Sequence, residues 1–187
     1  MKNDLRSKKI ALVAHCVLNQ NAVVGGLSRY PAVIPGVFET LKAHDFSIVQ
    51  LPCPEMYAAG LDRWGQVKEQ YANSGFKRSF QEAAEVALTS VEDYVSHGYK
   101  IVIIGIEGSP SCGITLTESN PDWGGTLIDA KDESAKLINA RGTFMDVLFE
   151  KIRERGWIPF PAIGLSSNTE GNSSSIKPLE DFLTMFD

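Results

Sequence analysis

Long hydrophobic runs are scarce in this sequence of 187 residues. The apolar run Ile101 to Ile106 is far shorter than the roughly 18 residues that a membrane-spanning helix needs, and it indicates a buried strand. The N-terminal segment Met1 to Lys9 carries mixed charge and lacks both the apolar core and the small-residue cleavage site of a signal peptide. We therefore expect a cytoplasmic protein with no membrane partner.

An excess of basic charge is also lacking, because 18 Lys and Arg stand against 23 Asp and Glu, for a net charge of −5. Such a chain has no general basic surface, so we expect no nucleic acid polymer among its partners. The dinucleotide fingerprint G-x-G-x-x-G is absent after the first predicted strand, which weighs against a nicotinamide cofactor.

Cysteine is sparse as well: the chain has three, at Cys16, Cys53 and Cys112, and no C-x-x-C pair. Their odd number and wide spacing argue against disulfides. In a reducing compartment each thiol is available as a metal ligand, as a nucleophile or as a small core residue.

What is present is the composition of an ordinary globular domain, with 43% hydrophobic and 22% charged residues. The length suits one domain with a sizeable core, and no linker or internal repeat divides the chain. We expect residues 1–187 to form a single α/β domain.

Short apolar segments alternate with amphipathic ones along the chain. The predicted strands are Lys9–His15, Phe46–Leu51, Lys100–Ile106 as the central strand, and Trp157–Ile163, an edge strand because of its two prolines. The predicted helices are Val33–His44, Phe76–His97 and Arg141–Arg155, with a Ser-rich loop and a short terminal helix over Gly171–Asp187. This order predicts a three-layer α/β fold with a mostly parallel sheet and right-handed, Rossmann-like crossovers.

All three cysteines lie just beyond predicted strands. Cys16 follows the first strand by one residue, Cys53 follows the second by two, and Cys112 lies six residues after the third in the loop Gly108–Gly113. The carboxyl ends of parallel strands meet at one edge of the sheet, where ligands bind in such folds. We therefore expect a common site rather than three separate core thiols.

Three chemistries suit such a site. Three thiolates can bind zinc and activate water, or hold an iron–sulfur cluster with one open iron, since four cysteines are the usual complement of a cluster. A cysteine nucleophile needs a base, but His44 and His97 are expected at the opposite edge of the sheet. His15 is expected to point to the strand face opposite Cys16. Zinc and iron–sulfur both stay open on the residues alone.

Polar residues accompany the cysteines. The Pro-Cys-Pro-Glu turn directs Glu55 toward the same edge as Cys53. There it is either a general acid or base, or else a solvated loop carboxylate or the first-turn acid of a helix starting at Met56. Ser109 and Ser111 belong to a loop whose backbone N–H groups can bind an anion or a cluster sulfide, although turn formation also explains them. The loop Asn19–Asn21 can hydrogen-bond a planar heterocycle or can be ordinary surface.

The segments Cys16-Val17-Leu18, Cys53-Pro54-Glu55 and Ser109-Pro110-Ser111-Cys112-Gly113, in this order, resemble the 2-thiouracil desulfidase family, formerly a domain of unknown function. The likeness extends over roughly Lys9 to Gly125, and its most specific part is Ser-Pro-Ser-Cys-Gly. It implies an α/β fold and sulfur removal, as hydrogen sulfide, from a small thiolated compound such as 2-thiouracil, 4-thiouracil or a thionucleoside.

By this resemblance Cys16, Cys53 and Cys112 hold a 4Fe-4S cluster whose open iron binds the substrate sulfur without redox change. Glu55, with Ser109 or Ser111, activates water or protonates the substrate. A non-catalytic sulfide- or metal-binding module and a cysteine-dependent hydrolase are the alternative functions.

Two departures from the family pattern indicate a related subgroup. Asn19 and a Gln-Asn stretch replace an expected Gly and Arg-Tyr-Asp-Gly segment, although Arg29-Tyr30 lies nearby. The second motif is extended by Ala59–Gly75, whose Arg63, Trp64 and Tyr71 have the character of a pocket lid, although ordinary packing explains Trp64 equally well.

Overall fold

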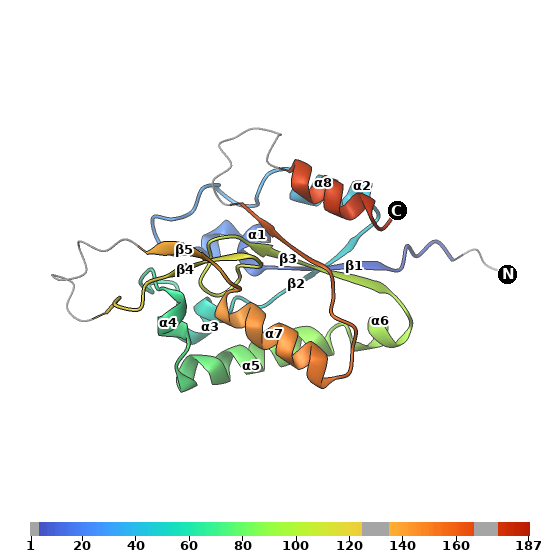
Figure 1. The fold of residues 1–187 in the computed structure, drawn as a ribbon. Coiled ribbons are helices and arrows are strands. Elements are labelled where there is room, and N and C mark those ends of the chain that lie inside the picture. The colour runs from blue at the N-terminus through green and yellow to red at the C-terminus, as the bar shows by residue number, and fades with distance from the viewer. Residues whose placement is uncertain (1–3, 125–134, 167–175) are drawn as a thin grey trace.

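Four parallel strands form the central sheet of the protein, which the computed structural model describes over residues 4–124, 135–166 and 176–187. In spatial order these strands are β2 (Ser47–Gln50), β1 (Lys9–Val13), β3 (Lys100–Ile106) and β6 (Ala162–Leu165). All pair in parallel, so their carboxyl ends meet at one edge of the sheet (Figure 1).

The two inner strands, β1 and β3, carry the core that their sequences predict. Side chains from Ile101 to Ile106 are buried, as are those from Ile10 to Val13. Neither strand alternates apolar and polar residues, because helices cover both faces. Burying one such aliphatic side chain contributes about 1.5–3 kcal/mol. This packing holds in place the strand ends from which Cys16 and Cys112 follow.

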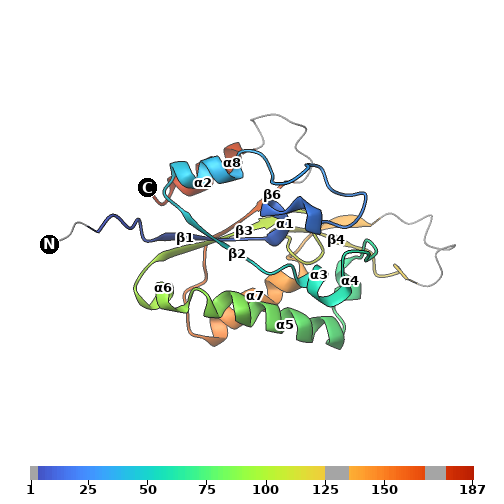
Figure 2. The same cartoon turned by 180° about the vertical axis from the view of Figure 1, so that it is seen from behind.

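Helices lie on both faces of the sheet, which confirms the three-layer α/β architecture (Figures 1 and 2). One face carries α2 (Val37–Ala43) and α8 (Lys177–Thr184), and the other carries α5 (Ser74–Thr89) and α7 (Thr143–Glu154). The shorter helices are α1 (His15–Leu18), α3 (Pro54–Ala59), α4 (Lys68–Tyr71), α6 (Glu92–Ser96) and the 3-10 helix η1 (Gln20–Ala22).

A two-stranded hairpin follows β3 and was not anticipated by the sequence analysis. Its strands, β4 (Leu116–Ser119) and β5 (Lys136–Asn139), pair antiparallel beyond the carboxyl edge of the main sheet (Figure 1). Each strand has only four residues, and β5 is exposed throughout. A strand is predicted from the alternation of apolar and polar residues. These strands are too short to show it, and β5 has no buried face that would require it.

The helix predicted over Phe76–His97 is wrong in one respect, since it is two helices, α5 and α6, that divide at Ser90. The Ser90 hydroxyl donates to the Ala87 carbonyl at 2.6 Å. Side-chain bonding to a nearby backbone carbonyl competes with the regular helical pattern, which accounts for the division.

The last predicted strand is also shifted. β6 begins at Ala162 rather than at Trp157, because Pro159 and Pro161 have no N–H group to donate to a ladder. It lies at the edge of the sheet, as predicted. The predicted terminal helix is α8, whereas the Ser-rich part of the loop before it lies outside the described residues.

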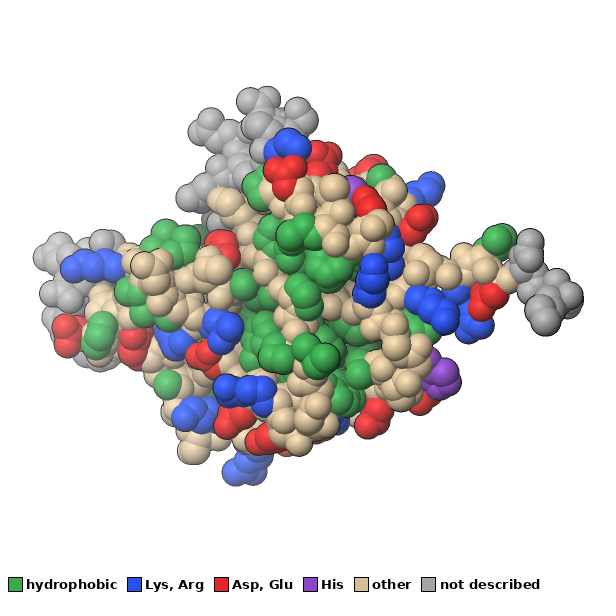
Figure 3. Space-filling model, turned by 45° about the vertical axis from the view of Figure 1, so that its right-hand side comes forward, with side chains coloured by type: hydrophobic (Ala, Val, Ile, Leu, Met, Phe, Trp, Pro, Cys, Tyr) green, Lys and Arg blue, Asp and Glu red, His purple; other side chains and the backbone are tan. Residues whose placement is uncertain are grey.

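The surface is not uniformly polar. Figure 3 shows hydrophobic side chains gathered near the centre of one face, with charged side chains toward its rim. Exposed apolar atoms are normal on protein surfaces, so this group of hydrophobic side chains by itself indicates no partner. Within the described residues, no helix combines the length and the apolar character that crossing a membrane requires.

Candidate active site

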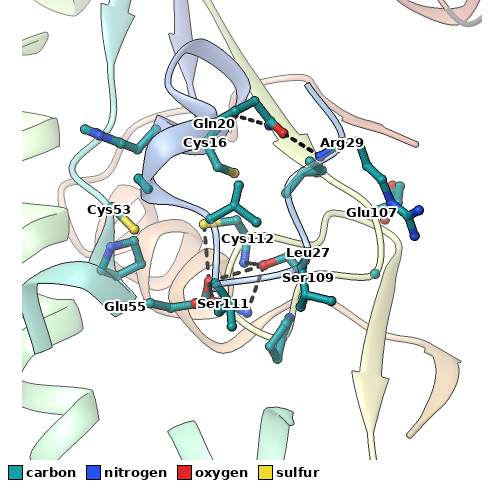
Figure 4. A pocket seen from close by; sticks show the side chains of 18 of the residues that line it. Cys16, Gln20, Leu27, Arg29, Cys53, Glu55, Glu107, Ser109, Ser111 and Cys112 are labelled. Atoms are coloured by element: carbon teal, nitrogen blue, oxygen red, sulfur yellow. Dashed lines mark hydrogen bonds between the residues drawn. The ribbon is translucent and has the colours of Figure 1, made fainter. Parts of the chain in front are cut away.

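Cys16, Cys53 and Cys112 line one cavity at the carboxyl edge of the sheet (Figure 4). Each comes from a different segment: Cys16 from α1, Cys53 from the residue before α3, and Cys112 from the loop after β3. The cavity has a volume of about 180 Å³, and all three cysteines are free thiols. The fold thus brings the three predicted ligands to a single site.

The first cysteine lies on a helix rather than at the end of a strand. β1 ends at Val13, and α1 begins at His15. The expectation that His15 and Cys16 point to opposite faces is therefore wrong, because both line the cavity. His15 Nε2 lies 3.2 Å from the side-chain nitrogen of Asn19. In the described part of the chain, no group of three or more His, Cys, Asp and Glu side chains is arranged to hold a single metal ion.

The two other histidines lie far from the thiols, as predicted. His44 follows α2 and pairs with Asp187 at 2.8 Å, and its carbonyl accepts from Lys9 at the start of β1. His97 follows α6 and bonds the Asp93 carbonyl. Both are therefore at the amino edge of the sheet.

Cys53 caps the amino end of α3. Its Sγ accepts from the Met56 N–H at 3.4 Å, and Pro54 occupies the first helical position, where its missing N–H costs nothing. This local geometry follows from the Pro-Cys-Pro-Glu sequence. It places Glu55, which is buried, in the first turn and on the wall of the same cavity.

The loop that carries Cys112 is held by hydrogen bonds between its own residues. The Ser109 Oγ accepts from the Cys112 N–H at 3.0 Å, and the Ser109 carbonyl accepts from the Gly113 N–H at 3.0 Å. Ser109 therefore holds the backbone of Cys112 directly. Turn formation is one of the two expected roles of the serines. Ser109 also lines the cavity, with its Oγ 3.3 Å from the Ser111 Oγ, so its predicted part in the reaction stays a prediction.

The amino end of α7 holds the same loop from outside. The Thr143 N–H donates to the Pro110 carbonyl at 2.9 Å, and the Met145 N–H donates to the Ser111 carbonyl at 3.1 Å. The first N–H groups of a helix have no partner within the helix, so the loop satisfies them. A distant segment of the sequence thus fixes the position of Cys112.

Two glycines permit this close packing. A Cβ at Gly105 would overlap the Cys112 carbonyl, and a Cβ at Gly142 would overlap the Ser111 carbonyl. In both cases the obstacle is backbone, which cannot move aside as a flexible side chain can. Any larger residue at these positions must displace the Cys112 loop.

We expect Gly142→Ala to destabilise the protein by about 1–3 kcal/mol, as overpacking does. Urea unfolding measures the effect. Gly65→Ala is the control for an added methyl group, since nothing lies within 4 Å of a Cβ there and its φ is outside the left-handed region. Wild-type stability in Gly142→Ala would contradict the account of the loop.

Glu55 links the cysteine segments through a buried hydrogen-bond network. Its Oε1 accepts from the Ser111 Oγ at 2.6 Å, and its Oε2 accepts from the Arg63 Nε at 3.0 Å. The Ser111 Oγ also lies 3.5 Å from the Cys112 Sγ. A carboxylate and a hydroxyl thus adjoin a thiol on one wall of the cavity (Figure 4).

The surroundings of the thiols favour their neutral form. Burial raises the pKa of Cys16 to about 12, with contributions from Cys53 and Glu55. Burial also raises the pKa of Cys53, and raises that of Cys112 well above its usual value. A nucleophilic cysteine needs a lowered pKa, whereas a bound metal deprotonates its thiol ligands itself. The site is therefore better suited to metal ligation than to a free thiolate.

The remaining walls are mostly apolar. Val23, Val24 and Leu27 come from the loop after η1, and Arg29 and Glu118 also line the cavity. Burial raises the pKa of Glu118.

Of the predicted polar loop Asn19–Asn21, only Gln20 lines the cavity. Its amide is engaged by the chain itself: Nε2 donates to the Cys16 carbonyl at 2.7 Å, and Oε1 accepts from the Arg29 N–H at 3.3 Å. Gln20 therefore ties the loop after η1 to the segment that carries Cys16.

The sequence profile of the family described as "Putative 2-thiouracil desulfurase" matches residues 8–125. The chain belongs to this family. The match covers all three cysteines, Glu55 and both serines, so the family resemblance read from the motifs is confirmed.

One relative and one solved structure are similar to this family member. The uncharacterized protein MJ0003 of Methanocaldococcus jannaschii is 38% identical over 110 residues, which are 59% of this chain and 70% of that protein. The solved structure of the [4Fe-4S]-dependent thiouracil desulfidase TudS superposes with a TM-score of 0.52 and 20% identity, covering 95% of this chain and 98% of TudS. That likeness shows the shared fold.

Two features of this family member escaped the sequence analysis. The family match ends before α7, whose amino end fixes the Cys112 loop. The extended segment does not form the expected lid, because Trp64 is 69% exposed, Tyr71 is buried in the core, and only Arg63 lines the cavity. In the sequence, Arg63 is simply an arginine eight residues after Glu55, and that spacing alone does not indicate that the two side chains pair.

Proposed function

We propose that this protein is a 4Fe-4S-dependent desulfidase that removes sulfur from a small thiolated compound, such as 2-thiouracil, 4-thiouracil or a thionucleoside, as hydrogen sulfide. Cys16, Cys53 and Cys112 would hold the cluster. One observation carries the proposal: three free thiols from separate segments line one cavity, beside a buried carboxylate bonded to a hydroxyl. The family membership and the activity of TudS agree with it.

The residues of the cavity fit such a group. Thiolates are the ligands that iron–sulfur clusters take from proteins. One water needs only about 10–15 Å³ of such space, so a cavity of about 180 Å³ has room for a polynuclear group rather than for one ion alone. When bound through three thiolates, a cluster supplies one open, Lewis-acidic iron with affinity for sulfur.

The overall reaction is a hydrolysis: a thiocarbonyl and water give a carbonyl and hydrogen sulfide, with no electrons transferred. It requires both protons to leave the attacking water and two protons to reach the departing sulfur. Ser111 and Glu55 form a hydrogen-bonded pair on the cavity wall that can orient water and carry a proton. Ser109 supports the Cys112 backbone, as its bond to that N–H indicates.

The lining of the cavity suits a small heterocyclic substrate. Val23, Val24 and Leu27 offer apolar surface, while Arg29 and Glu118 offer polar groups. Displacement of water strengthens the electrostatic interactions of the Glu55–Ser111 pair.

Anaerobic purification and reconstitution test the proposal. We expect about four iron and four sulfide per chain, and release of several equivalents of sulfide from 2-thiouracil or 4-thiouridine. Iron, zinc and sulfide are each assayed on the same sample, and the pyrimidine product is quantified by chromatography.

Three results would each point elsewhere. One zinc with no iron would indicate a zinc site. At most one sulfide per chain across a panel of thioamides, from protein with full iron, would indicate a sulfide-binding module. Turnover by iron-free protein would indicate a cysteine-dependent hydrolase.

A further inference from the structure

The geometry points to Arg63 as a positioning residue that holds the Glu55 carboxylate against Ser111, an inference that rests on the proposed function. Arg63 lies in the extended segment Ala59–Gly75, outside the motifs that carry the family resemblance. Its side chain is 3% exposed, and it pairs with Glu55 at 3.0 Å. A buried arginine beside the wall of a reaction site requires an explanation of its own.

Three partners hold the guanidinium from different sides. Nη2 donates to the Ala22 carbonyl at 2.7 Å, Nη1 donates to the Gly60 carbonyl at 3.1 Å, and Nε donates to Glu55 Oε2. Two of these acceptors are backbone carbonyls at the end of η1 and the end of α3. The guanidinium is therefore anchored independently of Glu55, and it presents Nε to the carboxylate as a fixed donor.

The two carboxylate oxygens of Glu55 have different partners. Oε2 is held by Arg63, which leaves Oε1 directed at the Ser111 Oγ at 2.6 Å. Holding both oxygens fixes the rotation of the carboxylate about its last side-chain bond. Without Arg63, the carboxylate loses one of these two restraints, and its contact with Ser111 is held less strictly. Misplacement by about 1 Å can cost roughly 10²-fold in rate.

Arg63 also joins two cysteine segments. Ala22 lies in the chain that follows Cys16, whereas Gly60 and Glu55 lie in the chain that follows Cys53. Only a planar, forked group with donors in several directions can bridge three such acceptors; a lysine ammonium is a single point of charge. The residue type therefore matches the positioning role.

The test compares Arg63→Lys and Arg63→Met with wild type, all reconstituted anaerobically, using 2-thiouracil as substrate. We expect both variants to keep wild-type iron and a KM within threefold, while kcat falls about 100-fold in Arg63→Met and less in Arg63→Lys. A third variant, Arg63→Ala, is assayed with and without added guanidinium ion, which should partly restore its kcat.

A readout independent of activity accompanies the kinetics. In a crystal structure of Arg63→Lys we expect the Ser111 Oγ to Glu55 Oε1 contact, 2.6 Å in the wild type, to lengthen beyond hydrogen-bond distance. Arg155→Lys is the matched control, because Arg155 pairs with Glu85 at 2.6 Å away from the cavity, and it should leave iron, KM and kcat unchanged.

The outcomes separate this inference from the proposed function. A wild-type kcat in Arg63→Met, or an unchanged Ser111–Glu55 contact in Arg63→Lys, overturns the positioning role even if the protein is a desulfidase. Iron-loaded wild type that releases no sulfide overturns the desulfidase, and the crystal structure of Arg63→Lys still decides whether Arg63 holds Glu55. If Arg63→Met fails to fold, the kcat of Arg63→Lys decides: a fall at wild-type iron supports the role, and no change refutes it.

Discussion

Replacing any one of Cys16, Cys53 and Cys112 by serine is expected to abolish both iron binding and sulfide release. Each thiol comes from a separate segment, so the remaining two cannot supply the third ligand by a local shift. Serine is close to cysteine in size but is a hard oxygen ligand, unlike the thiolates that clusters require. We expect iron to fall from about four per chain to below one, and activity to fall by more than the roughly 10–100-fold that follows loss of a group hydrogen-bonded to a metal ligand.

Iron and sulfide assays on anaerobically reconstituted variants measure the effect, and circular dichroism with a thermal scan shows that each variant folds. Ser90→Ala, at the carboxyl end of α5, is the control that shows the effect of purification and reconstitution alone. A pattern in which one cysteine is essential and two are dispensable would refute the common cluster and favour a nucleophilic thiol. Equal loss of zinc, with no iron in the wild type, would identify a zinc site instead.

Glu55→Gln is expected to keep the cluster ligands and lose catalysis. Glutamine preserves the size of the side chain and can accept one hydrogen bond, but it cannot take a proton from Ser111 or water. General acid–base catalysis contributes about 10²–10⁴-fold, so we expect kcat to fall by that factor while iron stays at the wild-type level. Loss of charge beside buried Arg63 also destabilises the fold by about 1–3 kcal/mol, so rates are normalised to folded, iron-loaded protein.

Ser111→Ala should resemble Glu55→Gln if the two side chains act as a pair, and the double variant should then be little worse than either single one. Glu85→Gln provides the control, because it also removes a carboxylate from an ion pair with arginine but lies on α5, away from the cavity. Activity within twofold of wild type in Glu55→Gln would remove this carboxylate from the mechanism.

Much of the fold could be predicted because its signals are local. The run Lys100–Ile106 is hydrophobic at nearly every position, and β3 has those same bounds. The predicted helix Arg141–Arg155 became α7, two residues shorter at its start and one at its end. Where local bonding interrupts such a pattern, as Ser90 does between α5 and α6, periodicity alone misleads.

The residues that form the site could be predicted from the sequence, but the contacts between them could not. The motifs indicate Cys16, Cys53, Cys112, Glu55, Ser109 and Ser111, and all of them line the cavity. The strand geometry assumed for His15 was wrong because the chain turns into a helix directly after β1. Arg63 was interpreted as part of a lid, since the sequence shows the residue but not the carbonyls that it binds.

The order of amino acids alone specifies a parallel sheet in which three of the four strands are each followed by a cysteine, because strand polarity and apolar runs are properties of short segments. Only the tertiary structure decides that Ser111 meets Glu55 across 56 residues and that Arg63 meets the Ala22 carbonyl across 41. The same holds for α7, whose free N–H groups secure the Cys112 loop. Such contacts depend on the direction in which whole elements pack, and no short stretch of sequence records that direction.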